Sequence, residues 1–138
     1  MFTSVAIIGR PNVGKSSLFN KLTKSRDAIV SDFPGLTKDR NYGFFDIDDD
    51  KILIIDTGGI VNESDNLKEA ISNQAWSAVE ESSFIILMLD SSENLTKDDL
   101  DILHKLRKLN KDYVIVLNKI DKKTDSLIKE DLQKEGIH

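Results

Sequence analysis

The chain has 138 residues, of which 39% are hydrophobic and 31% charged, and it carries a net charge of −5. This length predicts one domain with its own core, and the acidic balance gives no general reason to expect nucleic-acid or membrane binding, so an RNA partner would need a local patch or another part of a longer protein. The chain has no cysteine, which excludes a disulfide framework and suits the cytoplasm, and we find no signal peptide and no apolar run long enough to span a bilayer.

A phosphate-binding loop is indicated near the N-terminus. The apolar run 5–8 predicts a buried strand, and a helical apolar pattern begins at Ser16. Between them, residues 9–16 fit the pattern G-x-x-x-x-G-K-[ST], in which backbone N–H groups and a helix N-terminus bind phosphate. We expect Lys15 to reach the outer phosphates and the Ser16 hydroxyl to hold Mg²⁺. The alternative is a glycine-rich turn that matches by chance.

A long loop and a hairpin are predicted next. The first helix is expected to end near Ser25, and a polar loop then runs to Tyr42. Loops of that length are usually functional or mobile. The apolar stretches 44–47 and 52–55 flank the polar residues 48–51, which predicts a β-hairpin and therefore one antiparallel strand in the sheet.

The second half of the chain alternates helices with apolar strands. A helix is predicted from about Ser64, with Trp76 on the face opposite its apolar stripe, where it is either an ordinary exposed side chain or a contact for a partner. The elements predicted after it are a buried strand over 84–89, a helix capped by Thr96, a buried strand over 113–117 and a polar helix over 126–135. This alternation predicts an α/β domain in three layers, with a mostly parallel sheet.

Three polar segments are expected to meet at one edge of the sheet, because ligands bind at the carboxyl ends of parallel strands. These segments are the phosphate loop, Asp56-Thr57-Gly58-Gly59 and Asn118-Lys119-Ile120-Asp121. Asp56 is expected to hold a metal ion directly or through water, and the Gly59 N–H to sense the terminal phosphate.

The last of these segments is expected to select guanine. Guanine presents its N1–H and its exocyclic amine side by side, and the Asp121 carboxylate can accept both, whereas adenine offers no such pair of donors. Asn118 is expected to bond the other edge of the base and to brace the phosphate loop, with the Lys119 stem across the ring. The alternatives are a polar turn without a ligand and an ATPase in which this stretch is accidental.

These motifs, in their order and spacing, resemble the TrmE–Era group of P-loop GTPases, and within it the first GTPase domain of the Der (EngA) family of ribosome-assembly factors. The resemblance covers nearly the whole chain, and it is carried by residues 9–16, 28–43 and 56–60. Asp-Thr-Gly-Gly, where related families usually have Asp-x-Pro-Gly, favours this family. The resemblance implies a GTPase that hydrolyses GTP to GDP and phosphate with Mg²⁺, as a switch acting on the large ribosomal subunit and rRNA through the full-length protein.

The resemblance also assigns roles in catalysis. It implies that the Thr37 hydroxyl and N–H reach Mg²⁺ and the γ-phosphate. Ile60 stands where Ras-like enzymes place a water-orienting glutamine, and isoleucine cannot orient a water. Asn12 stands where the group binds a monovalent cation, so we hypothesise that K⁺ there supplies the charge that an arginine finger supplies elsewhere. Arg26 and Arg40 are alternatives that are better explained as solvated loop charges.

The full set of expected site residues combines the motifs and the resemblance. The expected nucleotide contacts are Gly9, Arg10, Pro11, Asn12, Val13, Gly14, Lys15, Ser16, Ser17, Asp56, Thr57, Gly58, Gly59, Ile60, Asn118, Lys119, Ile120 and Asp121. The expected metal ligands are Ser16, Thr37 and Asp56, and the expected catalytic residues are Lys15, Asn12, Thr37 and Gly59.

The resemblance finally bears on the extent of the domain. A GTPase domain of this type continues into a further strand, a loop that touches guanine and a last helix, so residues 1–138 are interpreted as one GTPase domain in a C-terminally truncated, monomeric fragment. The competing class of function is a nucleotide-gated binding module with negligible hydrolysis of its own. Neither His104 nor His138 matches a motif, and neither is assigned a role.

Overall fold

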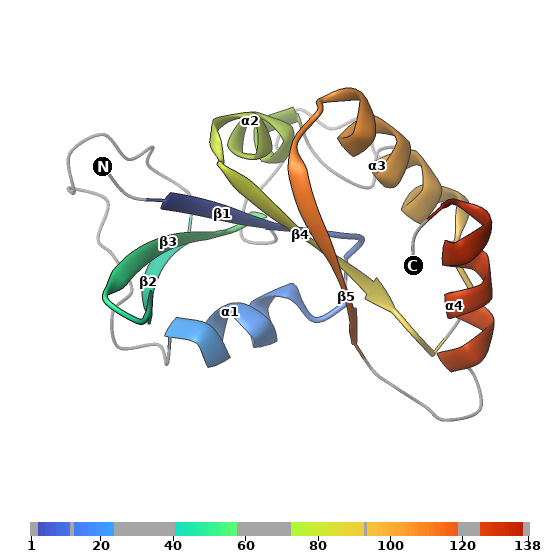
Figure 1. The fold of residues 1–138 in the computed structure, drawn as a ribbon, viewed down its shortest axis with the longest axis horizontal. Coiled ribbons are helices and arrows are strands. Elements are labelled where there is room, and N and C mark those ends of the chain that lie inside the picture. Colours follow the sequence, from blue (N-terminus) through green and yellow to red (C-terminus); the bar gives the residue numbers. More distant parts are fainter. Residues whose placement is uncertain are drawn as a thin grey trace.

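A mixed five-stranded sheet forms the centre of the molecule (Figure 1). The computed structural model describes residues 3–11, 13–23, 41–57, 73–92, 94–118 and 125–136. The strands are β1 (Thr3–Ile8), β2 (Asn41–Ile47), β3 (Asp50–Asp56), β4 (Phe84–Asp90) and β5 (Asp112–Asn118), in the spatial order β2-β3-β1-β4-β5. All neighbours pair in parallel except β2 and β3, which form an antiparallel hairpin. The predicted α/β fold, mostly parallel with one antiparallel strand, is confirmed.

Helices cover both faces of this sheet. They are α1 (Lys15–Thr23), α2 (Asn73–Glu81), α3 (Lys97–Lys108) and α4 (Asp125–Lys134). In Figure 1, α1 lies on one face, α2 and α3 lie on the other, and α4 stands beside α3. Among the helices in the part of the chain that the structure describes, none is long and apolar enough to cross a membrane.

The core follows the alternation of side chains along the strands. In β1, Ala6 and Ile8 belong to the apolar cluster shared with α2 and α3, whereas Ile7 belongs to the cluster shared with α1. Such a period of two is expected when both faces of a sheet are covered. Ile7, Ile8 and Ala6 are each 0% exposed, so β1 fixes the centre of the sheet and the phosphate loop begins where it ends.

The helix α3 begins at a complete capping box. Thr96 Oγ1 accepts a hydrogen bond from the Asp99 N–H, and the Asp99 carboxylate accepts one from the Thr96 N–H. The expectation that Thr96 caps this helix is confirmed. Its last turn carries Lys105, Arg107 and Lys108, where cations stabilise the partial negative charge of a helix C-terminus.

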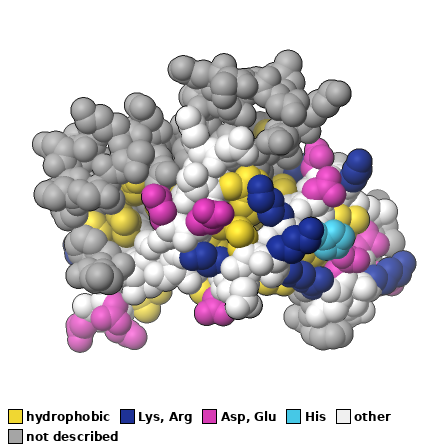
Figure 2. Space-filling view, turned by 90° about the horizontal axis from the view of Figure 1, so that it is seen from above, with side chains coloured by type: hydrophobic (Ala, Val, Ile, Leu, Met, Phe, Trp, Pro, Cys, Tyr) yellow, Lys and Arg dark blue, Asp and Glu magenta, His cyan; other side chains and the backbone are white. Residues whose placement is uncertain are grey.

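Charged side chains are unevenly placed on the surface. Figure 2 views the α2 and α3 side of the molecule, where Lys and Arg side chains gather beside a histidine. The turn of the β2–β3 hairpin, by contrast, exposes Asp48, Asp49 and Asp50. His104, to which the sequence assigned no role, lies 2.8 Å from Glu135 of the turn after α4, measured from Nε2 to Oε1.

The expectation that Trp76 lies on the polar face of its helix is wrong. Trp76 is only 8% exposed and belongs to the cluster that also contains Val79 and Leu106. The helix α2 packs against the sheet and against α3, so its buried surface is wider than one apolar stripe. Lys105 completes the cover, with Nζ 4.6 Å from the centre of the indole ring.

Several predicted boundaries also change. The strand β2 begins at Asn41, so Asn41 and Tyr42 belong to the sheet rather than to the preceding loop, because β2 pairs with β3 as far as Asp56. The hairpin turn is shorter than 48–51, since β3 already begins at Asp50. The strand β5, expected to be buried, is only half-buried, and Val114 is 44% exposed. The predicted helix start at Ser64 and helix end at Ser25 lie outside the described residues.

Candidate functional site

The loop after β1 makes a close approach to β4 and β5 that only glycine permits. A Cβ at Gly9 would lie 2.6 Å from the Met88 carbonyl oxygen, and one at Gly14 would lie 2.1 Å from Asn118 Nδ2. Gly14 also has φ of 107°, a conformation that side chains other than glycine rarely adopt. The two glycines of the predicted motif therefore bring the phosphate loop against the ends of two other strands.

Lys15 lies over the backbone of this loop. Its Nζ donates hydrogen bonds to the carbonyl oxygens of Gly9, at 2.5 Å, and Arg10, at 2.7 Å, and the residue is 8% exposed. Burial lowers the pKa of Lys15 from 10.5 to about 8, the Asp56 carboxylate opposes this change, and the Arg10 guanidinium adds to it. The ammonium group is thus held inside the loop with few water contacts, where an anionic ligand would favour its charged form.

Ser16 and Asp56 form a second polar contact at the loop. Ser16 Oγ donates a hydrogen bond to Asp56 Oδ2 at 3.0 Å. Asp56 is the last residue of β3 and is 1% exposed. The next residue, Thr57, donates from Oγ1 to the Ile7 carbonyl oxygen at 2.5 Å, which ties the end of β3 to β1. A hydroxyl and a carboxylate at this spacing are hard oxygen donors of the kind that Mg²⁺ takes in proteins, so these residues fit that ion.

Asn118 connects the end of β5 to the phosphate loop. Its Nδ2 donates to the Val13 carbonyl oxygen at 2.9 Å, across 105 residues of sequence. Its own carbonyl oxygen accepts hydrogen bonds from both the N–H and the Oγ of Ser91, each at 2.9 Å. Asn118 therefore joins three parts of the molecule: the phosphate loop, the residue after β4 and the end of β5. This contact agrees with the expectation that Asn118 braces the phosphate loop.

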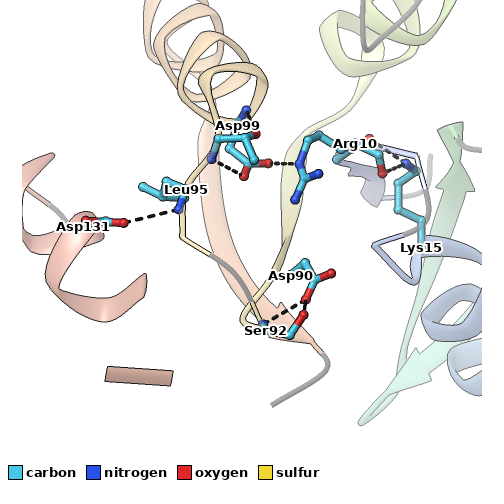
Figure 3. Close-up of polar contacts among 9 residues, drawn as sticks. Arg10, Lys15, Asp90, Ser92, Leu95, Asp99 and Asp131 are labelled. Carbon is cyan, nitrogen blue, oxygen red and sulfur yellow. Dashed lines mark hydrogen bonds and ion pairs between the residues drawn. The ribbon is translucent and has the colours of Figure 1, made fainter. Parts of the chain in front are cut away.

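Arg10 reaches out of the loop to a helix that the sequence did not connect with the site. Its Nε donates to Asp99 Oδ1 at 2.7 Å (Figure 3). Asp99 is 1% exposed, and it was not among the expected site residues. Asp98, Asp99 and Asp101 stand together in α3, so composition alone does not distinguish the one that faces the loop. The signal that could have found it is the capping-box spacing from Thr96, which fixes the direction of the Asp99 side chain.

The structure thus brings part of the expected site together. The expected residues that it describes are Gly9, Arg10, Pro11, Val13, Gly14, Lys15, Ser16, Ser17, Asp56, Thr57 and Asn118. Pro11 within the loop and Ser17 just after it are exposed, whereas Val13 is 1% exposed and packs in the core under α1. The remaining expected residues lie outside the described part of the chain, and they are Asn12, Thr37, Gly58, Gly59, Ile60, Lys119, Ile120 and Asp121.

The chain is similar to known proteins over most of its length. Residues 4–119 match the family described as 50S ribosome-binding GTPase. GTPase Der of Idiomarina loihiensis is 47% identical over 121 residues, which cover 88% of this chain and 25% of that protein. GTPase Der of Stenotrophomonas maltophilia is 42% identical over 138 residues, which cover 99% of this chain and 30% of that protein. The chain therefore spans about a quarter to a third of the length of these relatives.

Solved structures with the same fold include two of Era. Era in complex with MgGDPNP and a 16S ribosomal RNA segment has a TM-score of 0.74 and 35% identity, covering 98% of this chain and 48% of that one. An Era variant from Aquifex aeolicus bound to GDP and AlF4⁻ has a TM-score of 0.73 and 34% identity, covering 96% of this chain and 46% of that one.

Proposed function

Because the chain belongs to the 50S ribosome-binding GTPase family, we propose that it binds GTP and hydrolyses it to GDP and phosphate. The observation that carries this proposal is the meeting of three separate segments at one loop: Lys15 lies on the loop backbone, Ser16 contacts Asp56, and Asn118 contacts Val13. A loop held in this way presents its backbone N–H groups and the N-terminus of α1 to an anion.

Lys15 is proposed to hold the outer phosphates. Its ammonium group already bonds the loop carbonyls of Gly9 and Arg10, so it stays at the loop and moves only a short way to meet phosphate oxygens. During hydrolysis, negative charge develops on the γ-phosphate oxygens. The Lys15 ammonium group would attract this charge more strongly than it would in water, because it lies in a poorly solvated position.

Ser16 and Asp56 are proposed to hold Mg²⁺ together with Thr37, which lies outside the described residues. Mg²⁺ held there would neutralise part of the charge of the phosphates. The contact between Thr57 and Ile7 supports this assignment, because it fixes the end of β3 and with it the Asp56 carboxylate beside the loop.

The remaining catalytic assignments are carried by the family resemblance. We propose that the Gly59 N–H senses the γ-phosphate and that Asn12 helps to bind K⁺, which supplies positive charge in place of an arginine finger. Ile60 has no group that could orient the attacking water. Hydrolysis is therefore expected to be faster in KCl than in NaCl, and equal rates in the two salts would remove K⁺ from the mechanism.

Guanine is the proposed base. Asp121 is assigned to the N1–H and the exocyclic amine, and Asn118, Lys119 and Ile120 to the remaining contacts around the ring. Support comes from the position of Asn118, whose side chain contacts Val13 of the phosphate loop. Because the segment after β5 begins beside this loop, one nucleotide can place its base at that segment and its phosphates at the loop.

In the cell, the proposed role is that of a cytoplasmic switch in assembly of the large ribosomal subunit. The relatives named GTPase Der are about four times as long as the matched segment, so contacts with the subunit and its rRNA are assigned to the larger protein. The Era structure, which was solved with an RNA segment, supports an RNA-linked role for the group.

The test is a titration of the chain with labelled GDP in the presence of Mg²⁺, followed by competition. GTP and GDP should displace the label and ATP should not, because adenine has no pair of donors for the Asp121 carboxylate that we assign to guanine. Asp121→Asn should weaken GDP binding by about 100-fold or more. Asp112→Asn is the matched control, since Asp112 is exposed at the opposite end of β5.

A single-turnover assay then separates an enzyme from a binding module. An enzyme should release phosphate faster when K⁺ and Mg²⁺ are present than when either is removed. A rate that stays at a very low value under all these conditions, and with the longer protein and ribosomal particles added, would favour the nucleotide-gated module. Absence of any GDP binding would contradict both.

A further inference from the structure

The side chain of Arg10 connects the phosphate loop to the first turn of α3. Arg10 Nε lies 2.7 Å from Asp99 Oδ1, and the two side chains are 17% and 1% exposed, respectively (Figure 3). The residues are 89 positions apart in sequence. This ion pair is therefore a nearly buried tertiary contact between the candidate site and a helix that supplies none of its expected ligands.

Asp99 offers a fixed carboxylate. One of its oxygens, Oδ2, accepts the Thr96 N–H at 3.0 Å, while the Asp99 N–H donates to Thr96 Oγ1 at 3.1 Å. The capping box thus holds the side chain in one orientation and leaves Oδ1 for Arg10. The same turn is held from the opposite side, because the Leu95 N–H donates to Asp131 Oδ2 of α4 at 3.3 Å.

Arg10 also contacts Lys15. The Arg10 carbonyl oxygen accepts a hydrogen bond from Lys15 Nζ at 2.7 Å, so the residue whose side chain is held by α3 also holds the expected phosphate-binding lysine. One residue therefore separates the Asp99 carboxylate from the Lys15 ammonium group. A shift of Arg10 would move one of the two carbonyls that Lys15 contacts.

We propose that Asp99 is a positioning residue for nucleotide binding, which holds the phosphate loop in its binding shape through the side chain of Arg10. This inference rests on the proposed function. Helix capping alone does not explain the contact, since the capping box is complete without Arg10. A purely structural ion pair is the competing account, and the measurements of stability and GDP affinity below separate the two.

The proposal differs from direct binding of phosphate by Arg10, which is one of the expected nucleotide contacts. If Arg10 itself bound phosphate, removing the charge of Asp99 would release the guanidinium and leave affinity unchanged or raised. If Asp99 positions the loop, the same change lowers affinity. The two accounts therefore predict opposite signs for one substitution.

The experiment compares GDP affinity and thermal stability in four variants of the 138-residue chain. Asp99→Asn keeps the size of the side chain and an acceptor for the Thr96 N–H, and it should weaken GDP binding by about tenfold. Arg10→Gln should weaken it by a similar factor, and the double variant should be no weaker than either single one, because both remove the same contact.

Thr96→Ala is the matched control. It removes the Oγ1 acceptor for the Asp99 N–H but keeps the Thr96 N–H that holds the Asp99 carboxylate. It should therefore lower the melting temperature while GDP affinity stays within about twofold of the unaltered chain. A purely structural role for Asp99 predicts instead that Asp99→Asn and Thr96→Ala behave alike in both measurements.

Each result has a separate meaning. If the unaltered chain binds no GDP, the proposed function fails. If it binds GDP and Asp99→Asn binds equally well or better, only the positioning role is overturned. Should Asp99→Asn fail to fold, Arg10→Lys decides the question: lysine keeps the charge but lacks the Nε that meets Asp99, so reduced affinity supports the role and unchanged affinity overturns it.

Discussion

The two faces of the sheet are closed in different ways. The face under α2 and α3 is sealed by a continuous apolar cluster, and among its members are Trp76, Val79, Leu87, Leu103 and Leu106. On the other face, α1 contributes Phe19 to a smaller cluster, and its first turn is held by the polar contacts of Lys15 and Ser16.

This difference separates the part of the molecule that stabilises the fold from the part that binds. Buried apolar area contributes about 25 cal/mol per Å², whereas one hydrogen bond contributes about 1 kcal/mol net. We therefore expect the α2 and α3 face to set the free energy of unfolding, and the start of α1 to open more easily and to respond to ligand. Substitutions on the two faces should affect stability and GDP affinity in different proportions.

Gly14→Ala should have the largest effect, and it should fall on binding. A Cβ there would lie 2.1 Å from Asn118 Nδ2, on a residue whose φ is 107°. Strain and overlap together should cost about 4 kcal/mol in the bound shape of the loop, which corresponds to about a 1000-fold loss of GDP affinity. Calorimetry with GDP measures this. Gly136→Ala is the control. Gly136 also has a positive φ, of 82°, but a Cβ there meets nothing within 4 Å, so this substitution introduces backbone strain without overlap.

Trp76→Ala tests the opposite face. Trp76 is 8% exposed and lies in the large cluster under α2 and α3. Removing its ring should lower the free energy of unfolding by about 3 kcal/mol, as measured by urea denaturation, while GDP affinity stays within about twofold. Trp76→Phe is the control, since it keeps an aromatic ring and should lose less. A large fall in affinity with Trp76→Ala would show that the two faces are not independent.

The pKa of Lys15 gives the comparison a dependence on pH. Burial lowers that pKa to about 8 in the folded chain, from 10.5. Between pH 8 and pH 10.5, Lys15 is still protonated in the unfolded chain but has lost its proton in the folded chain. The cost of burying the charged form therefore lowers the stability of the fold below pH 8, and this cost disappears as the pH rises above 8. From pH 7 to pH 9.5, the stability of the chain relative to Lys15→Met should rise by about 2 kcal/mol. Urea unfolding of both proteins at the two pH values measures it, and a constant difference would contradict the buried charge.

The sequence predicted the fold well because the strands carry their own signal. The apolar runs at 84–89 and 113–117 lie inside β4 and β5, and the hairpin follows from polar residues between two apolar stretches. The ends of the strands and the buried faces of the helices were less predictable. Asn41 joins β2 because it pairs with Asp56, a contact that local composition does not contain.

The site was predictable only where its residues stand in short motifs. Lys15, Ser16 and Asn118 were identified because each belongs to a pattern of adjacent residues. Asp99 was missed because its partner is 89 residues away and the neighbouring acidic residues are equivalent in composition. Trp76 was misplaced for a related reason, since a helix between a sheet and a second helix is buried on more than one side.

The smallest expected effect is that of Asn118→Ala, and it measures how tightly the two halves of the candidate site are joined. The substitution removes the hydrogen bond from Nδ2 to the Val13 carbonyl oxygen. The loss should lower the free energy of unfolding by about 1 kcal/mol, and it should also weaken GDP binding. It also removes the atom that a Cβ at Gly14 would strike. The variant Gly14→Ala/Asn118→Ala should therefore lose less GDP affinity than the two single losses together, by the part of the Gly14→Ala cost that comes from overlap. Strict additivity would mean that backbone strain at Gly14 accounts for the whole cost, and that the contact with Asn118 does not limit the shape of the loop.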